Sequence, residues 1–153
     1  YFTKFFRAKS KKAQSAIDSI STEFKLNTEQ ERAFRLVANH AVDDSAPPLR
    51  MYLGGVGGTG KSQVIKALIT FFEGRNESHR FIVLGPTGTS AALLNGSTYH
   101  SVLGIRDSMD DSERVAGVTI RKVQERLRGV EYVFIDKISM VSCNALYSIC
   151  ARL

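Results

Sequence analysis

A glycine-rich octapeptide, residues 55–62, constrains this chain more than any other feature. It reads Gly-Val-Gly-Gly-Thr-Gly-Lys-Ser and has the spacing G-x-x-x-x-G-K-[ST]. Glycines let the backbone adopt positive φ and turn successive N–H groups toward a phosphate chain. In such a loop Lys61 reaches the β- and γ-phosphates, and the Ser62 hydroxyl ligates Mg²⁺. The residues predicted to hold a nucleotide here are Gly55, Gly57, Gly58, Thr59, Gly60, Lys61 and Ser62.

The segments on either side of this loop follow the order that such a site requires. Residues 49–53, Leu-Arg-Met-Tyr-Leu, form a short apolar run that predicts a buried strand. After the loop, apolar residues recur at helical spacing from Val64 to Phe72, and Gly74 suits the C′ position that ends a helix. The N-terminus of that helix adds partial positive charge to the phosphate site. These neighbours favour a nucleotide site over the alternative, a glycine-rich turn that binds nothing.

The length and composition are those of one globular domain. The chain has 153 residues, enough to bury a real core, of which 43% are hydrophobic and 24% charged. No apolar run approaches the length of a membrane span and no signal peptide is visible, so we expect an intracellular protein without a membrane segment. Because the chain begins at Tyr1 and stops at Leu153 inside an apparent helix, we expect a piece of a longer protein. Cys143 and Cys150 lie about 10 Å apart along that helix, too far for a disulfide, and are expected to be small core residues.

Positive charge is concentrated at the start of the chain. The net charge is +6, and residues 1–25 hold six basic residues against two acidic ones. Aromatic residues are interleaved with this charge, as in segments that bind single-stranded nucleic acid. The alternative is an amphipathic helix with the lysines on its solvent face. Both interpretations are open, and the apolar stripe of the second comprises Phe2, Phe6, Ala13, Ile17, Ile20 and Phe24.

Helical and strand patterns alternate along the rest of the chain. Thr28 and Glu31 form a capping box, which predicts a helix running to Val42. Apolar runs at 81–84 and 130–135 predict two further buried strands. This alternation predicts an α/β fold in which a mostly parallel sheet is covered by helices on both faces, a three-layer αβα arrangement. Between the two strands we expect a short helix at 90–94, a structured stretch at 98–103, a polar surface excursion at 105–117 and a helical face at 120–127.

Three predicted loops fall where ligands bind in such folds. In a parallel sheet flanked by helices, ligands lie beyond the carboxyl ends of the strands. Loops 54–62, 85–90 and 136–139 each follow a predicted strand and carry polar residues. We therefore expect the three loops to lie together at one edge of the sheet.

Four stretches of the chain form a recurring set: Leu-Asn-Thr-Glu-Gln at 26–30, the glycine-rich loop at 54–62, residues 85–92 with 96–101, and Ile-Asp-Lys-Ile-Ser-Met at 135–140. Together they resemble the first RecA-like lobe of a superfamily-one DNA helicase of the petite-integration-frequency (PIF) family. That family includes genome-maintenance helicases and the helicase domains of Helitron-type transposons. The resemblance implies a RecA-like P-loop NTPase lobe at 26–153, preceded by a basic helical segment at 1–25. The stretch at 26–30 is similar to the family's Q motif, and the loop at 54–62 to its Walker A motif. Residues 85–92 with 96–101 are similar to motif Ia and the segment beside it, and residues 135–140 to Walker B.

The resemblance implies an ATP-dependent DNA helicase that moves 5′ to 3′ and uses ATP and Mg²⁺. Its partners would be single-stranded DNA and a second RecA-like lobe, and its location the nucleus or mitochondrion in a eukaryote. Gln30 would read adenine, since its amide offers the donor and acceptor that the N6 and N7 edge demands. The alternative for Gln30 is an exposed residue in the first turn of a helix. Residues implied to face DNA are Thr87, Gly88, His100 and Ser101, of which Thr87 is also suited to cap a helix.

Residue 137 departs from the family's pattern. Walker B carries Asp-Glu, in which the Asp holds Mg²⁺ and the Glu orients and deprotonates the attacking water. Here Asp136 is followed by Lys137, and a protonated amine cannot accept that proton. Loss of a general base costs on the order of 10²–10⁴-fold in rate. We therefore expect Lys61 and Asp136 to serve binding while hydrolysis is impaired, and the alternative is a non-catalytic, degenerate nucleotide-binding or structural module.

Overall fold

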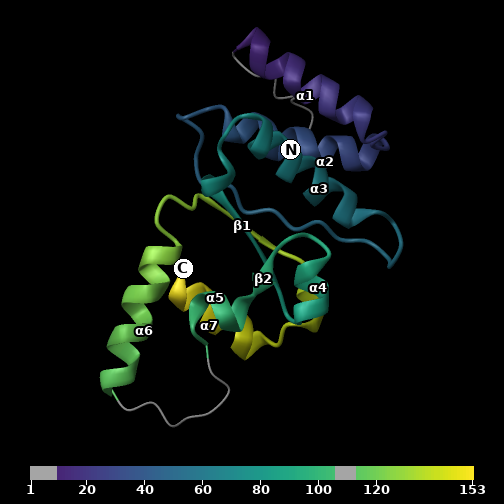
Figure 1. Ribbon diagram of the computed structural model, residues 1–153. Helices are drawn as coiled ribbons and strands as arrows, with labels where there is room; N and C mark the ends of the chain where they lie inside the picture. Colours follow the sequence, from purple (N-terminus) through teal and green to yellow (C-terminus); the bar gives the residue numbers. More distant parts are fainter. Residues whose placement is uncertain (1–9, 106–112) are drawn as a thin grey trace. The chain divides into compact units, whose positions relative to one another are not determined.

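The computed structural model describes residues 10–105 and 113–153, and of residues 113–119 it describes the backbone alone (Figure 1). Phe2 and Phe6 of the predicted apolar stripe lie outside the described residues. The chain divides into two compact units, residues 1–78 and residues 79–153. In the described ranges no helix has both the length and the hydropathy needed to cross a bilayer.

The described part of the first unit is built from helices packed on one another. Helix α1 spans Lys11–Glu23, α2 spans Thr28–Ala41 and α3 spans Lys61–Gly74. Each of the three helices contacts the other two. The ring of Phe34 on α2 meets that of Phe71 on α3 edge to face, with centroids 6.2 Å apart and planes at 87°. This apolar interface packs the C-terminal part of α3 against α2, and the phosphate loop leads into the other end of α3, at Lys61.

Helix α1 confirms the amphipathic interpretation for the described part of the basic segment. Ala13 and Ile17 are buried against the other helices, whereas Lys11 and Lys12 are exposed. The apolar face therefore packs α1 onto its own unit, and the lysines lie toward solvent. Nothing in this arrangement tests the alternative that the segment contacts nucleic acid.

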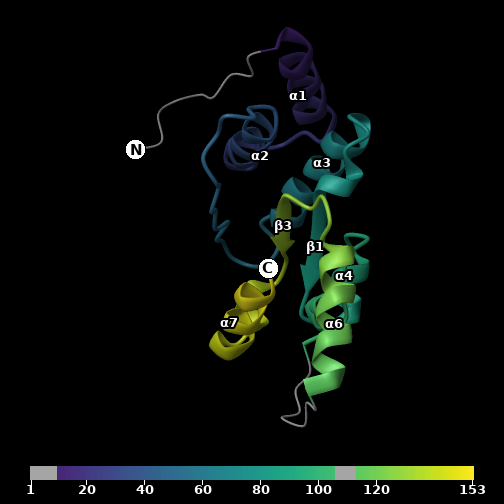
Figure 2. The same cartoon turned by 90° about the vertical axis from the view of Figure 1, so that its left-hand side faces the viewer.

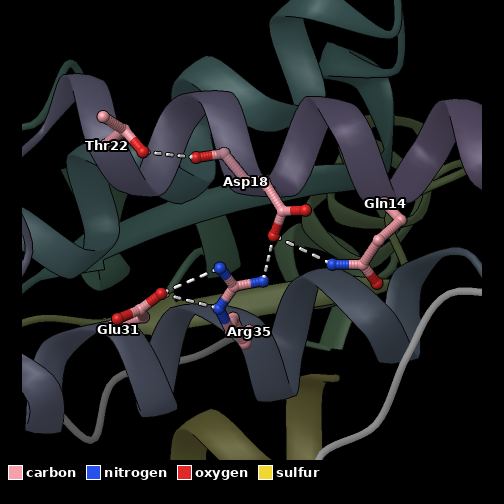
Figure 3. A network of polar contacts seen from close by, with 5 residues as sticks. All are labelled: Gln14, Asp18, Thr22, Glu31 and Arg35. Carbon is pink, nitrogen blue, oxygen red and sulfur yellow. Dashed lines mark hydrogen bonds and ion pairs between the residues drawn. The ribbon is translucent and has the colours of Figure 1, made fainter.

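A polar network joins α1 to α2 (Figure 3). The guanidinium of Arg35 donates to Asp18 Oδ1 at 2.6 Å and to Glu31 Oε1 at 2.8 Å. The side-chain amide of Gln14 donates to the same Asp18 oxygen at 3.0 Å, and the Thr22 hydroxyl donates to the Asp18 carbonyl at 2.9 Å. The hydrogen bond from Arg35 lowers the pKa of the Glu31 carboxyl below its ordinary value. This network fixes the orientation of α1 on the first turns of α2.

Two predicted helix ends are wrong: the start of α2 by one residue and the C′ position of α3 by two residues. Asn27, not Thr28, caps α2: Asn27 Oδ1 accepts from the Gln30 amide at 2.9 Å, and Gln30 Oε1 accepts from the Asn27 amide at 3.0 Å. The capping box is therefore Asn27–Gln30, because the sequence holds two overlapping frames that both fit the motif. At the C-terminal end of α3, Gly74 is the last helical residue and not the C′ residue. The left-handed conformation expected at C′ is adopted by Asn76, with φ 57°.

The strand predicted at residues 49–53 is wrong. The segment is irregular, and Leu49, Met51 and Tyr52 are exposed, Tyr52 by 77%. A strand is stabilised by hydrogen bonds to a neighbouring strand. The described part of the first unit, residues 10–78, contains no strand that could pair with this segment. The apolar composition alone therefore does not impose an extended, paired backbone.

The second unit confirms the predicted α/β class with a parallel sheet. The sheet has the order β2-β1-β3, and both pairings are parallel, with Leu84 opposite Ile135 and Gly85 opposite Thr98. Figure 2 shows α7 on one side of β1 and β3, with α4 and α6 on the other. The elements of this unit are β1 Phe81–Gly85, α4 Gly88–Ala92, β2 Ser97–Thr98, α5 Tyr99–Leu103, α6 Glu113–Arg126, β3 Tyr132–Ile135 and α7 Cys143–Arg152, with short 3₁₀ helices η1 Ser78–Arg80 and η2 Ile138–Met140.

The core of the second unit lies between the sheet and its helices. Leu84 of β1, Leu103 of α5 and Ile149 of α7 are fully buried, and Val123 of α6 packs with them. Helix α6 begins at Glu113, so the last five residues of the polar excursion predicted at 105–117 are helical, and 106–112 lie outside the described residues.

The prediction that Cys143 and Cys150 are core residues is also wrong. Both cysteines are exposed and free. On α7 they lie about 100–120° round the helix from Ile149, the residue that this helix buries in the core. Their seven-residue spacing placed them on one face of the helix, but the spacing does not say which face is buried.

Candidate nucleotide and nucleic-acid sites

The glycine-rich loop of the first unit adopts the curled backbone that its sequence predicts. Gly55, Gly58 and Gly60 have φ of 144°, 81° and 80°, values that side-chain-bearing residues rarely adopt. Gly60 is the N-cap of α3 and offers no side-chain acceptor to the first turn. The amides of that turn, together with the positive end of the helix, form the kind of surface that binds anions.

Lys61 places its ammonium group within the curve of the loop. Its Nζ donates to the carbonyls of Gly55 and Val56, both at 2.8 Å, and lies 3.4 Å from Thr59 Oγ1. The Thr59 hydroxyl also donates to the Val56 carbonyl at 2.9 Å. The positive charge therefore lies inside the curve of the glycine loop. Ser62 lies in the first turn of α3 directly after Lys61, half-buried.

Gln30 reaches the same loop from α2. Its Nε2 donates to the Thr59 carbonyl at 3.1 Å and to the Gly60 carbonyl at 3.4 Å, while its Oε1 accepts from the Asn27 amide. Gln30 does lie in the first turn of α2, but it is half-buried and bonded to the loop. The reading of adenine by Gln30 remains a prediction. Sequence reasoning missed the contact with the loop, because Thr59 and Gly60 follow Gln30 by 29 and 30 positions in the chain.

Thr87 and Gly88 begin α4 at the carboxyl end of β1. Thr87 Oγ1 accepts from the Ser90 amide at 3.2 Å, and Ser90 Oγ donates to the Thr87 carbonyl at 2.9 Å, so Thr87 caps α4 as its residue type indicated. Both Thr87 and Gly88 are exposed. They are therefore accessible, and the Thr87 hydroxyl is already used within the chain.

His100 and Ser101 lie in α5, which directly follows β2. Thr98 Oγ1 accepts from the Ser101 amide and caps this helix, and the His100 ring lies against that of Tyr99 with centroids 4.0 Å apart. Arg126 of α6 donates to the Ser101 carbonyl at 2.5 Å. Sequence reasoning missed Arg126, because a lone basic residue on a helix carries no motif. Since β2 pairs with the end of β1, the structure brings the two predicted DNA segments to the same edge of the sheet.

Asp136 follows β3 at that edge. Its amide donates to the Leu84 carbonyl of β1 at 2.9 Å, and the residue is half-buried. Lys137 is exposed and left-handed, with φ 55° and ψ 39°, and precedes η2. The structure thus confirms that loops 85–90 and 136–139 share one edge of the sheet. Loop 54–62 belongs to the first unit, and its predicted place beside the other two is not tested.

Comparisons with known proteins identify relatives along most of the chain. A family model described as PIF1-like helicase matches residues 25–150. The ATP-dependent DNA helicase PIF4 of Trypanosoma brucei brucei is 29% identical over 140 residues, which are 89% of this chain and 16% of that protein. The ATP-dependent DNA helicase Pif1 of Bdellovibrio bacteriovorus is 32% identical over 126 residues, 81% of this chain and 26% of that protein. The ATP-dependent DNA helicase RRM3 of Saccharomyces cerevisiae is 26% identical over 134 residues, 84% of this chain and 17% of that protein. The chain thus spans a small part of the length of these relatives, and no solved structure matches it.

Proposed function

This chain belongs to the PIF1-like helicase family, and on that premise we propose that it is the ATP-binding motor lobe of an ATP-dependent DNA helicase. The observation that carries the proposal is the loop at 55–60, curled by three glycines of positive φ around the Lys61 ammonium. A glycine loop of this curvature with one cation inside it is suited to the β- and γ-phosphates of a nucleoside triphosphate.

Within this proposal each site residue has a separate task. Lys61 and the loop amides hold the phosphates, and Ser62 and Asp136 hold Mg²⁺. Gln30, which lies beside the loop, reads the adenine edge. The support for Ser62 and Asp136 is their chemistry, since Mg²⁺ binds hard oxygen ligands and usually keeps several waters. Asp136 also follows a strand of the parallel sheet, where such ligands are found.

The single-stranded DNA track of the proposed motor includes the edge of the sheet beyond β1 and β2. Thr87, Gly88, His100 and Ser101 contribute hydroxyl, amide and ring groups there, and such groups can contact sugar and phosphate without reading sequence. Their support is the placement of α4 and α5 at one edge by the parallel pairing of β1 with β2. Movement from 5′ to 3′, a second RecA-like lobe and an intracellular location, in the nucleus or mitochondrion of a eukaryote, belong to the same proposal.

Hydrolysis in this lobe is proposed to be impaired, because Lys137 stands where the family has a general base. Lys137 is exposed at the end of β3, directly after Asp136. The test is DNA-stimulated ATP hydrolysis by a two-lobe form of the parent protein, with and without Lys137→Glu. The expected result is a rise on the order of 10²–10⁴-fold in the variant. Equal and rapid turnover in both proteins would refute the proposed impairment.

A second candidate function is a non-catalytic nucleotide-binding or structural module. Lys137 favours it, because a domain released from catalysis tolerates loss of the general base. The same experiment separates the two functions. Restoration of turnover by Lys137→Glu supports a disabled motor, whereas ATP binding without turnover in both two-lobe forms supports the module.

A further inference from the structure

We infer that Gln30 is a positioning residue for the phosphate loop, which it holds independently of any nucleobase. The inference rests on the proposed function, because it assigns Gln30 a second task in the same nucleotide site. It concerns the binding of a polyphosphate chain, and the reading of adenine is a separate task.

The first observation is how the Gln30 amide is used. Oε1 accepts from the Asn27 amide at 3.0 Å, which fixes the side chain in the capping box of α2. With the oxygen fixed, Nε2 is directed at the loop, where it donates to the carbonyls of Thr59 and Gly60 at 3.1 and 3.4 Å. The cap of one helix therefore holds the loop residues that lead into another.

The second observation is how closely the loop fits this side chain. Gly60 has φ 80°, and a Cβ built on it would collide with Gln30 Nε2. The absence of a side chain at Gly60 thus serves the approach of Gln30 as well as the backbone turn. Thr59 is fixed from its other side by the bond from its hydroxyl to Val56.

These contacts bear on the residues that would touch phosphate. Gly60 directly precedes Lys61 and is the N-cap of α3, so a displaced Thr59–Gly60 segment would move both Lys61 and the first amides of the helix. A loop already held in its binding geometry loses less conformational freedom when a ligand binds. Loss of the Gln30 donor should therefore weaken the binding of any polyphosphate, whether or not a base is attached.

The experiment compares Mg²⁺–ATP with Mg²⁺–tripolyphosphate, which has no base, by calorimetric titration of this 153-residue chain. In Gln30→Met, which keeps the length and neutrality of the side chain but lacks the amide, both ligands should bind roughly 3- to 10-fold more weakly. Gln30→Asn, whose amide is too short to reach the loop, should weaken both in the same direction and serves if Gln30→Met does not fold. Unchanged tripolyphosphate affinity with weakened ATP affinity in the folded variant would overturn the inference, since Gln30 would then act on the base alone.

Asn27→Ala is the matched control. It removes the acceptor of the Gln30 backbone amide from the same capping box but leaves the bonds of Nε2 to the loop. It should lower the thermal stability of the chain while the tripolyphosphate affinity stays close to that of the wild type. Equal losses of tripolyphosphate affinity in Asn27→Ala and Gln30→Met would overturn the inference in favour of a general effect of α2 stability. If the wild-type chain binds neither ligand, the proposed nucleotide site itself is refuted, an outcome distinct from the other two.

Discussion

Substitution of Gly60 by alanine tests the contact between the loop and α2 through the stability of the chain. Two separate costs arise at this position. The first is the left-handed backbone at φ 80°, which costs a residue with a Cβ about 1–2 kcal/mol. The second is the collision with Gln30 Nε2, which forces that amide away from the Thr59 and Gly60 carbonyls. A lost hydrogen bond of this kind is worth about 1 kcal/mol net.

The free energy of unfolding should therefore fall by about 2–3 kcal/mol in Gly60→Ala. In a Gln30→Ala background the collision is absent, and only the backbone cost of about 1–2 kcal/mol remains. The two substitutions should thus be less than additive by about 1 kcal/mol, which a double-mutant cycle measures directly.

Equilibrium urea unfolding followed by far-ultraviolet circular dichroism is suited to this cycle, because the chain has no tryptophan. The four proteins are the wild type, Gly60→Ala, Gln30→Ala and the double variant. Losses that add to within about 0.3–0.5 kcal/mol would refute the reasoning, since the two residues would then not be in contact.

Two further predictions concern the network between α1 and α2. The guanidinium of Arg35 donates to both Asp18 and Glu31, and the Arg35 side chain is only 25% exposed. Arg35→Met should therefore lower the free energy of unfolding by about 1–2 kcal/mol, as measured by urea titration. Asp18→Asn should cause a smaller loss. Because the Arg35 hydrogen bond lowers the pKa of Glu31 in the folded chain, the carboxylate stabilises the fold above its ordinary pKa of about 4.3. That contribution is lost as the pH falls through the lower, folded-state pKa. Glu31→Gln should therefore flatten the dependence of the unfolding free energy on pH below about 4.3, and an unchanged acid profile would contradict the assignment.

The parts of the fold that the sequence predicts well are those fixed by local spacing. The glycine loop and α3 follow from one octapeptide, because positive φ at Gly55, Gly58 and Gly60 is a property of the residue type itself. The strands β1 and β3 follow from short apolar runs between turn residues. Thr87 as the cap of α4 follows from its hydroxyl at the end of a strand.

The parts that the sequence predicts badly depend on contacts between distant segments. Residues 49–53 have the composition of a strand, but a strand also needs a partner, and composition does not provide one. Gln30 belongs to a stretch that resembles the Q motif, and nothing in that stretch indicates its hydrogen bond to Thr59, which is 29 residues away. The exposed face of α7 could not be distinguished from its buried face by spacing, which misplaced Cys143 and Cys150.

Equilibrium binding of Mg²⁺–ATP to this chain, beside Lys61→Ala, tests the proposed ATP-binding lobe most directly. The Lys61 ammonium is within the loop, so its removal should weaken binding by at least about tenfold, the size expected for a charge-assisted contact with phosphate. The account predicts saturable binding by the wild type, and much weaker binding by the variant at equal thermal stability. Equal affinities, or no saturable binding by the wild type at millimolar ATP, would contradict it.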